Sequence, residues 1–262
     1  MQLLVADVVE AEDSSWVGRR VVGEINLACG SCSWCARGLG RHCPKRSVLG
    51  IVKHPGAFAE FLTLPMANLH LVPHPMADEV AVFAEPVAAA CEILEQLPIA
   101  SGTPVAVLGD GKLGLLIAMV LQLHGARVDL YGRHPEKMAI AAELGVEPRS
   151  AGAAGRQYPI VVDATGSEQG LAAAIAMTEA RGTVVMKSTV SSRVSIDMAS
   201  VIVPEITLVG SRCGSFLEAI PLLLAGMLPV EKMIQGSYPL KAAPAAFEHA
   251  ARKGTLKIVL RP

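Results

Sequence analysis

The sequence feature that most constrains the fold is a glycine-rich loop between an apolar run and a helical pattern. The loop reads Gly109-Asp-Gly-Lys-Leu-Gly114. Before it, Pro104–Leu108 is a short apolar run that predicts a buried parallel strand. After it, Leu115–His124 predicts a helix and Arg127–Tyr131 predicts the next strand. A strand, G-x-G-x-x-G, helix and strand in this order are the context in which the motif binds a dinucleotide.

The loop residues have distinct expected roles. Gly109 would allow the tight turn, Gly111 would let pyrophosphate approach the backbone, and Gly114 would let the helix pack on the strand. The free N–H groups at the helix N-terminus favour a bound phosphate. We therefore expect Gly109, Gly111, Lys112, Leu113 and Gly114 to contact the cofactor. The alternative is a glycine-rich turn in an unrelated α/β protein.

The end of the second expected strand bears on which cofactor is bound. An NAD site usually carries Asp or Glu there, but this chain reads Tyr131-Gly-Arg-His134 with Lys137 one turn later. Arg133 could stack on adenine and pair with a 2′-phosphate, and His134 or Lys137 could add positive charge. Before Glu136, this stretch has no carboxylate to repel that phosphate. The pattern favours NADP over NAD; the alternative is a solvated basic start of a helix.

Strand and helix patterns continue to alternate along the chain. Helices are expected at Pro135–Leu144 and Gln169–Ala180, and strands in Pro159–Gly166, Arg181–Lys187 and Ile206–Val209. This alternation predicts an α/β fold with a doubly wound parallel sheet. Ligands bind at the carboxyl ends of such strands, so the expected contacts there are Thr165, Ser188 and Arg212. A simple turn role for Thr165 or Ser188 is the equal alternative.

Four of the six cysteines are close together in the sequence. Cys29, Cys32, Cys35 and Cys43 follow the pattern C-x2-C-x2-C-x7-C. Four thiolates with no open position predict a structural, tetrahedral zinc site. Free thiols, two disulfides or an iron–sulfur cluster are the alternatives from spacing alone. The isolated Cys91 and Cys213 are expected to be small buried hydrophobic residues.

Charge and hydropathy argue against nucleic-acid-binding and membrane-associated classes of protein. The formal net charge is −1, which argues against a nucleic-acid partner or a polybasic membrane surface. No apolar stretch approaches the roughly 20 residues that span a bilayer. The first residues lack the basic region of a signal peptide. We therefore expect a cytoplasmic protein without a membrane or nucleic-acid partner.

The combination of a four-cysteine lobe and a downstream dinucleotide motif resembles the zinc-dependent medium-chain dehydrogenase/reductase family of alcohol and polyol dehydrogenases. The segments Gly56–Phe61, Ala84–Ala88 and Val162–Ser167 also resemble segments of that family. By this resemblance, the metal at the cysteines is zinc, Glu85 is a ligand of a catalytic zinc, and Lys257 is a basic residue near the cofactor. The resemblance also implies a GroES-like catalytic domain at 1–86 with the zinc lobe at 29–43 and a Rossmann domain at 87–213. At 214–262 it implies the last Rossmann helix and a return to the catalytic domain.

The resemblance fails for two further ligands of the catalytic zinc. The family supplies a Cys from a segment that would precede this chain, and a His from a Gly-His-Glu motif where this chain has Gln2 and Leu3. Gln is a weak donor and Leu cannot coordinate a metal. His42, His54, His70 and His74 could help in principle, but no pair has a tight ligand spacing. We expect an N-terminally shortened family member in which a catalytic zinc is doubtful.

The resemblance implies an oxidoreductase that transfers hydride between NAD(P) and an alcohol or carbonyl carbon. It also implies a homo-oligomer, a dimer or tetramer, paired through a sheet edge at Thr207–Gly210. One alternative is a dinucleotide-binding protein without dehydrogenase activity, and a weaker one is a zinc-independent reductase of enones or quinones.

Overall fold

The computed structural model describes residues 3–152, 156–189 and 193–262. The chain divides into two compact units. The first unit contains residues 1–85 and 216–262, and the second contains residues 86–215.

The second unit is built on a six-stranded sheet in which every neighbouring pair is parallel. The strand order is β11-β10-β9-β6-β7-β8, which is the order typical of dinucleotide-binding folds. The strands are β6 (Pro104–Leu108), β7 (Arg127–Gly132), β8 (Glu147–Ser150), β9 (Tyr158–Asp163), β10 (Thr178–Met186) and β11 (Thr207–Gly210). The predicted doubly wound sheet is therefore confirmed.

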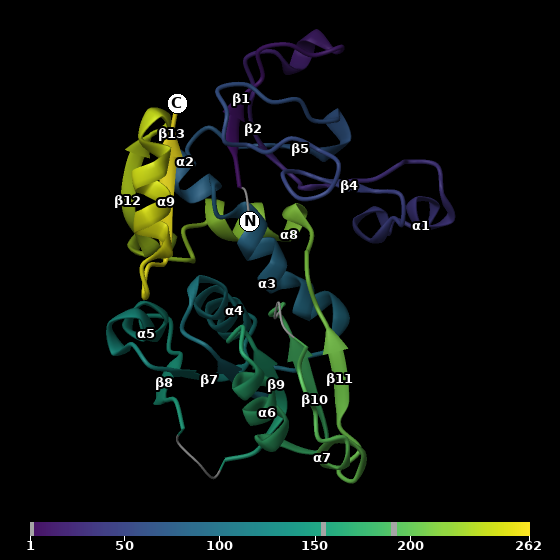
Figure 1. The fold of residues 1–262 in the computed structure, drawn as a ribbon, viewed down its shortest axis with the longest axis vertical. Helices are drawn as coiled ribbons and strands as arrows, with labels where there is room; N and C mark the ends of the chain where they lie inside the picture. The colour runs from purple at the N-terminus through teal and green to yellow at the C-terminus, as the bar shows by residue number, and fades with distance from the viewer. Residues whose placement is uncertain (1–2, 153–155, 190–192) are drawn as a thin grey trace. The chain divides into compact units, whose positions relative to one another are not determined.

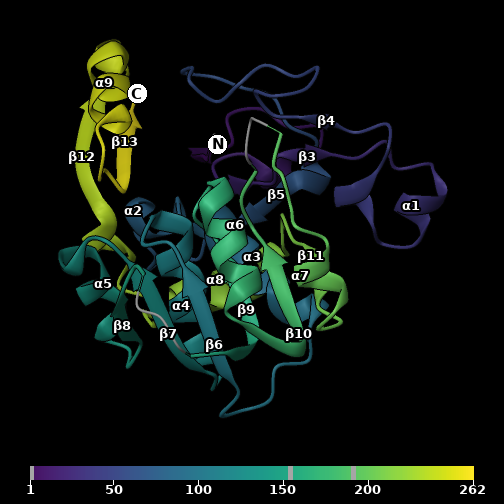
Figure 2. The ribbon, with the colours of Figure 1, turned by 60° about the horizontal axis from the view of Figure 1, so that its bottom comes forward.

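Helices connect these strands and cover the sheet. The helix α4 packs on β6 and β7, and α5 packs on β7 and β8, whereas α6 packs on β9 and β10. Figure 2 shows α6 in front of β9, with β10 beside it. The helices of this unit are α4 (Lys112–Leu123), α5 (Pro135–Ala142), α6 (Glu168–Ala176), α7 (Ala199–Ile202) and most of α3 (Ala84–Gln96), which begins in the first unit.

The direction of winding reverses beside β6, and this reversal creates the binding edge. β6 pairs with β7 on one side and with β9 on the other. Leu108 is aligned with Tyr131 on β7 and with Asp163 on β9, so the loops after the three strands meet at one edge. Ligands of open α/β sheets bind at such a reversal.

The predicted helix Gln169–Ala180 is wrong at its C-terminal end. The helix α6 ends at Ala176, and Thr178 already belongs to β10, where it is aligned with Tyr158 of β9. Helix-favouring residues such as Glu179 and Ala180 thus lie in an extended strand, since pairing within the sheet overrides local propensity.

A buried polar network joins two strands on one face of this sheet. The Tyr158 hydroxyl donates a 2.5 Å hydrogen bond to Oδ2 of Asp129 and lies 2.8 Å from the Tyr131 hydroxyl. Arg156 donates to the same carboxylate oxygen at 2.9 Å. Burial and the neighbouring Asp129 carboxylate raise the pKa of Tyr158. Because every member has a partner, the network can stabilise the positions of β7 and β9 on either side of β6.

The first unit contains small sheets. Figure 1 shows β12, β13 and α9 packed together in the yellow C-terminal part of the chain, where β12 and β13 form a parallel pair. A three-stranded antiparallel sheet has the order β1-β2-β5, and β3 pairs with β4. The strands of the first unit are β1 (Val5–Asp7), β2 (Arg20–Gly23), β3 (Asn26–Leu27), β4 (Ser47–Val48), β5 (Leu69–Leu71), β12 (Ile234–Pro239) and β13 (Lys257–Arg261). The helices of the first unit are α1 (Ser33–Ala36), α2 (Asp78–Ala81), α8 (Phe216–Leu224) and α9 (Ala243–Ala251).

Within the described residues, every helix is too short or too polar to cross a membrane.

Candidate functional site

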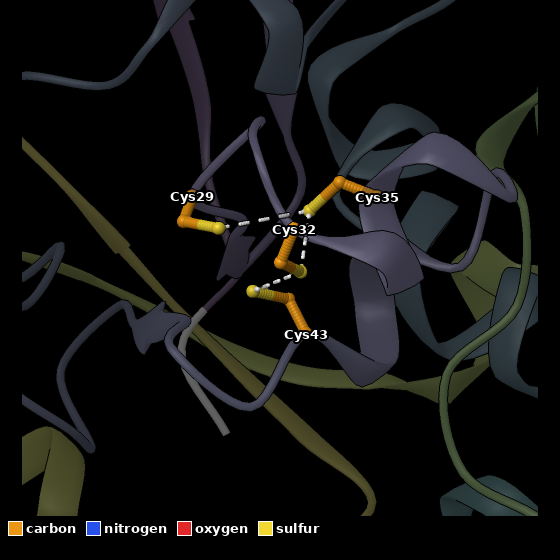
Figure 3. A group of neighbouring side chains, drawn as sticks. All are labelled: Cys29, Cys32, Cys35 and Cys43. Carbon is orange, nitrogen blue, oxygen red and sulfur yellow. Dashed lines mark hydrogen bonds between the residues drawn. The ribbon is translucent and has the colours of Figure 1, made fainter.

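The four clustered cysteines converge on one point in the first unit (Figure 3). The Sγ atom of Cys32 lies 3.5 Å from that of Cys35 and 3.7 Å from that of Cys43, and the Sγ atoms of Cys29 and Cys35 are 4.0 Å apart. All four sulfurs lie within 4.8 Å of one another. Tetrahedral zinc with Zn–S bonds of about 2.3 Å separates its sulfurs by about 3.8 Å. The cluster therefore fits a structural zinc ion, and all six cysteines are free of disulfides.

Local backbone geometry makes this convergence possible. Gly30 and Gly38 adopt positive φ angles of 73° and 75°, which reverse the chain between the ligands. The short helix α1 begins directly after Cys32 and carries Cys35. The N–H of Ser31 lowers the pKa of the Cys29 thiol to about 6, whereas burial raises that of Cys35 to about 11. A metal binds thiolates, so zinc would hold all four groups deprotonated.

The glycine-rich loop lies between β6 and α4, and two of its glycines are required by close contacts. Gly109 has a φ of +112°, and a β-carbon there would lie 2.8 Å from the carbonyl oxygen of Ala164. A β-carbon on Gly114 would lie 1.8 Å from the carbonyl oxygen of Gly109. A β-carbon on Gly111 would meet no atom within 4 Å. The loop is thus tight on its protein side and open at Gly111, as close approach of a pyrophosphate requires.

The other predicted loop contacts begin the helix. Gly111 is the N-cap of α4, and Lys112 and Leu113 occupy its first turn and are partly buried. The first N–H groups of an α-helix have no intrahelical acceptor, so this end of α4 can bind an anion.

The structure corrects one expectation at the end of β7. A carboxylate lies beside the residues that follow β7, but it belongs to Asp110 of the glycine-rich loop. Oδ2 of Asp110 accepts hydrogen bonds from the backbone N–H of Arg133 at 2.6 Å and of His134 at 2.7 Å. Sequence reasoning missed Asp110 because a contact between positions 23 and 24 residues apart leaves no periodic signal.

The predicted basic residues differ in exposure. The Arg133 side chain is exposed, and its guanidinium makes no ion pair within the described part of the chain. Lys137 is buried, with 7% of its surface exposed, and His134 is partly exposed beside Asp110. Burial raises the pKa of Asp110, but the hydrogen bonds from Arg133 and His134 outweigh it and hold that pKa below its ordinary value.

Thr165 and Ser188 lie in adjacent loops at the carboxyl ends of β9 and β10. The Thr165 N–H and hydroxyl both donate to Oδ1 of the buried Asp163, at 2.9 and 2.7 Å. The Ser188 hydroxyl oxygen accepts the N–H of Gly166 at 2.9 Å. These bonds fix the shape of the two loops beside the reversal in strand order.

A buried lysine that the sequence reading did not single out lies beside Ser188. Nζ of Lys187 donates to the carbonyl oxygens of Ala89 at 2.5 Å and Arg212 at 3.1 Å, and to the Ser211 hydroxyl at 3.0 Å. It thereby ties the ends of β10 and β11 to α3, while the predicted contact Arg212 is exposed.

Lys257 and Glu85 belong to the first unit. Nζ of Lys257 lies 3.4 Å from the carbonyl oxygen of Val82 and 5.0 Å from the centre of the Phe83 ring. Glu85 is 6% exposed and lines a shallow surface cleft. The lining residues are Leu3, Leu4, Val22, Gly23, Ala81, Val82, Ala84, Glu85 and Phe216.

This cleft does not fit a catalytic zinc. Such an ion needs three protein ligands and an open position, and the cleft offers one carboxylate. Among the described residues, the four cysteines are the one group of three or more metal-ligating side chains, so Glu85 belongs to no three-ligand site there. His70 instead lies 2.9 Å from the Glu24 carboxylate. Gln2, weighed above as a ligand replacement, lies outside the described residues.

Two family models match the chain. One, described as an alcohol dehydrogenase GroES-like domain, matches residues 4–74, and the other, described as a zinc-binding dehydrogenase, matches residues 113–225. The L-threonine 3-dehydrogenase of Chelativorans sp. (strain BNC1) is 38% identical over 144 residues, which are 54% of this chain and 41% of that relative. The matched part of the chain thus spans less than half the length of this curated relative.

Solved structures of similar proteins cover nearly the whole chain. Alcohol dehydrogenase TADH from Thermus sp. ATN1 has a TM-score of 0.87 at 28% identity, over 99% of this chain and 83% of that protein. A zinc-binding dehydrogenase from Sinorhizobium meliloti 1021, solved bound to NADP, has a TM-score of 0.87 at 26% identity, over 98% of this chain and 82% of that one. With the cysteine lobe and the parallel sheet, these matches show that the chain belongs to the zinc-dependent medium-chain dehydrogenase/reductase family.

Proposed function

We propose that this chain is an NADP-dependent oxidoreductase that transfers hydride between the nicotinamide ring and an alcohol or carbonyl carbon. The observation that carries the proposal is the glycine-rich loop at the reversal in strand order, tight at Gly109 and Gly114 and open at Gly111. The bound nicotinamide supplies the hydride chemistry.

The residues of the second unit would bind and orient this cofactor. The first N–H groups of α4, with Lys112 and Leu113, would bind the pyrophosphate. Arg133, His134 and Lys137 would hold the 2′-phosphate, since Arg133 is exposed and unpaired in the described chain. Thr165, Ser188 and Arg212, which follow the carboxyl ends of β9, β10 and β11, are the proposed contacts on the other side of the reversal. Lys257 is a further proposed contact, by the family resemblance.

The relatives support a small alcohol, polyol, sugar or amino-acid alcohol as substrate, or the matching carbonyl. The curated relative is named for threonine and the similar structure for alcohol. No step is assigned to a catalytic zinc, because Glu85 has too few partner ligands among the described residues.

The test is NADPH oxidation by the zinc-loaded chain with a panel of aldehydes and ketones, and NADP reduction with the matching alcohols and with threonine. The expected result is turnover of at least one class, abolished in the Gly111→Ala variant. NADPH binding without turnover of any panel member would contradict the enzymatic proposal.

That outcome would instead support the second candidate, a dinucleotide-binding protein without dehydrogenase activity. Within the described residues, Glu85 belongs to no group of three or more metal-ligating side chains, which favours this candidate. Both candidate functions predict that the chain binds NADPH, but only the oxidoreductase predicts turnover of a substrate.

Three further assignments complete the proposal. Residues 1–86 would belong to the catalytic domain and 87–213 to the dinucleotide-binding domain, and the boundary between the compact units at residue 86 supports this division. Residues 214–262 would hold the last helix of the dinucleotide-binding domain and the return to the catalytic domain. The chain would form a cytoplasmic homo-oligomer through β11, which lies at an edge of the sheet.

A further inference from the structure

Asp110 connects two parts of the nucleotide-binding edge that are far apart in the sequence. Its Oδ2 atom accepts the N–H groups of Arg133 and His134 and lies 3.0 Å from Nδ1 of His134. The carboxylate is mostly buried, with 12% of the side chain exposed. Hydrogen bonds to an ionised acceptor are among the stronger ones in proteins. The turn after β7 is therefore held directly by the glycine-rich loop.

The neighbouring glycine is shaped to admit this carboxylate. A β-carbon on Gly132 would lie 2.6 Å from both Cβ and Oδ2 of Asp110. The same β-carbon would lie 2.7 Å from Sδ of Met138, so any larger residue at position 132 would displace the Asp110 side chain together with that sulfur. The contact depends on two positions, one in the loop and one at the end of β7.

Asp110 contacts the His134 side chain but leaves the Arg133 side chain exposed. The carboxylate takes up the backbone N–H groups of the turn, and the Arg133 side chain remains exposed. Because Arg133 and His134 are fixed at their backbone atoms, their side chains start from a defined position relative to Gly109 and Gly111. A site held in its binding geometry loses less entropy when the ligand binds.

From these contacts we infer that Asp110 is a positioning residue for nucleotide selection: it holds the Arg133–His134 turn so that the turn binds the 2′-phosphate while the glycine-rich loop binds the pyrophosphate. This inference rests on the proposed NADP dependence. It assigns to the second residue of the glycine-rich motif a role in discriminating NADP from NAD, which differ only in that phosphate.

The experiment measures the dissociation constants of NADPH and NADH for the zinc-loaded chain and its variants by fluorescence titration. The wild-type chain should prefer NADPH, and Asp110→Ala should reduce this preference by about tenfold, the effect of losing one charge-assisted contact. Asp110→Asn should keep most of the preference, because its amide oxygen can accept the same backbone N–H groups. Gly132→Ala, which keeps the charge and displaces the side chain, should behave like Asp110→Ala. Glu136→Ala is the matched control, since it removes an exposed carboxylate from the start of α5.

The possible contrary results are distinct. A greater NADPH preference in both Asp110→Ala and Asp110→Asn would mean that the carboxylate repels the phosphate, and would overturn the inference. Equal weakening of both nucleotides, with a lowered melting temperature, would reduce Asp110 to a structural role and also overturn it. Equal wild-type affinities for the two nucleotides would overturn the inference but leave dinucleotide binding intact. Failure of the wild-type chain to bind either nucleotide would overturn the proposed function as well.

Discussion

Gly114 lies so close to Gly109 that a β-carbon on it would stand 1.8 Å from the Gly109 carbonyl oxygen. The first turn of α4 therefore rests directly on the backbone of the loop that precedes it. At Gly111, three residues earlier, the same test finds open space. Gly114 therefore allows the helix to pack on the loop, and Gly111 leaves room for a ligand.

This difference predicts opposite phenotypes for two alanine substitutions. Gly114→Ala should lower the free energy of unfolding by about 2 kcal/mol or more, because the loop and helix must separate. Gly111→Ala should leave stability nearly unchanged and weaken NADPH binding. Chemical denaturation and nucleotide titration of both variants check the prediction, and equal stability losses would contradict it.

The cysteine cluster predicts the metal content of the chain. Protein purified without added metal should contain about one zinc ion per chain, since four thiolates complete a structural site. Cys43→Ser should lose this zinc and melt at a lower temperature. Cys91→Ala, at a buried cysteine outside the cluster, is the control that should keep it. Two zinc ions per chain would show that Glu85 belongs to a second metal site.

Removal of zinc should affect the two units differently. The cluster belongs to the first unit, and the glycine-rich loop belongs to the second. A chelator should therefore release the metal and lower the first unfolding transition, while the dissociation constant of NADPH changes less than about twofold, within the usual spread of such effects. A parallel loss of zinc and NADPH binding would contradict this independence.

The buried network around Tyr158 predicts a pH dependence of stability at high pH. The pKa of Tyr158 is raised in the folded chain. The unfolded chain therefore releases the phenolic proton above a pH of about 10, whereas the folded chain still keeps it. Stability from this group is complete below that pH and falls as the pH rises further. Tyr158→Phe should remove this part of the slope and cost about 1 kcal/mol at neutral pH through the lost hydrogen bond to Asp129. Urea denaturation at pH 8 and at higher pH tests both statements, and an unchanged slope in the variant would contradict the first.

Local patterns in the sequence were sufficient where the structure is built from neighbouring residues. The strand Pro104–Leu108 is predicted with the bounds that the structure shows, because an apolar run ends there at a glycine-rich loop. The four cysteines converge as predicted, because the spacing of their ligands is local.

Contacts between distant residues explain what the sequence did not reveal. The end of α6 is set by the pairing of Thr178 with Tyr158, and Asp110 reaches the turn after β7 through space. Lys187, which the sequence does not distinguish from other lysines, is buried and donates to two carbonyl oxygens and a hydroxyl. In each case the deciding partner lies at least 20 residues away, or in another element of the sheet.

The most direct test of the account is calorimetric titration of the intact, zinc-loaded chain with NADPH. We expect saturable binding with about one nucleotide per chain, because one glycine-rich loop lies at one reversal in strand order. The absence of saturable binding by a folded chain that retains its zinc would contradict the central claim.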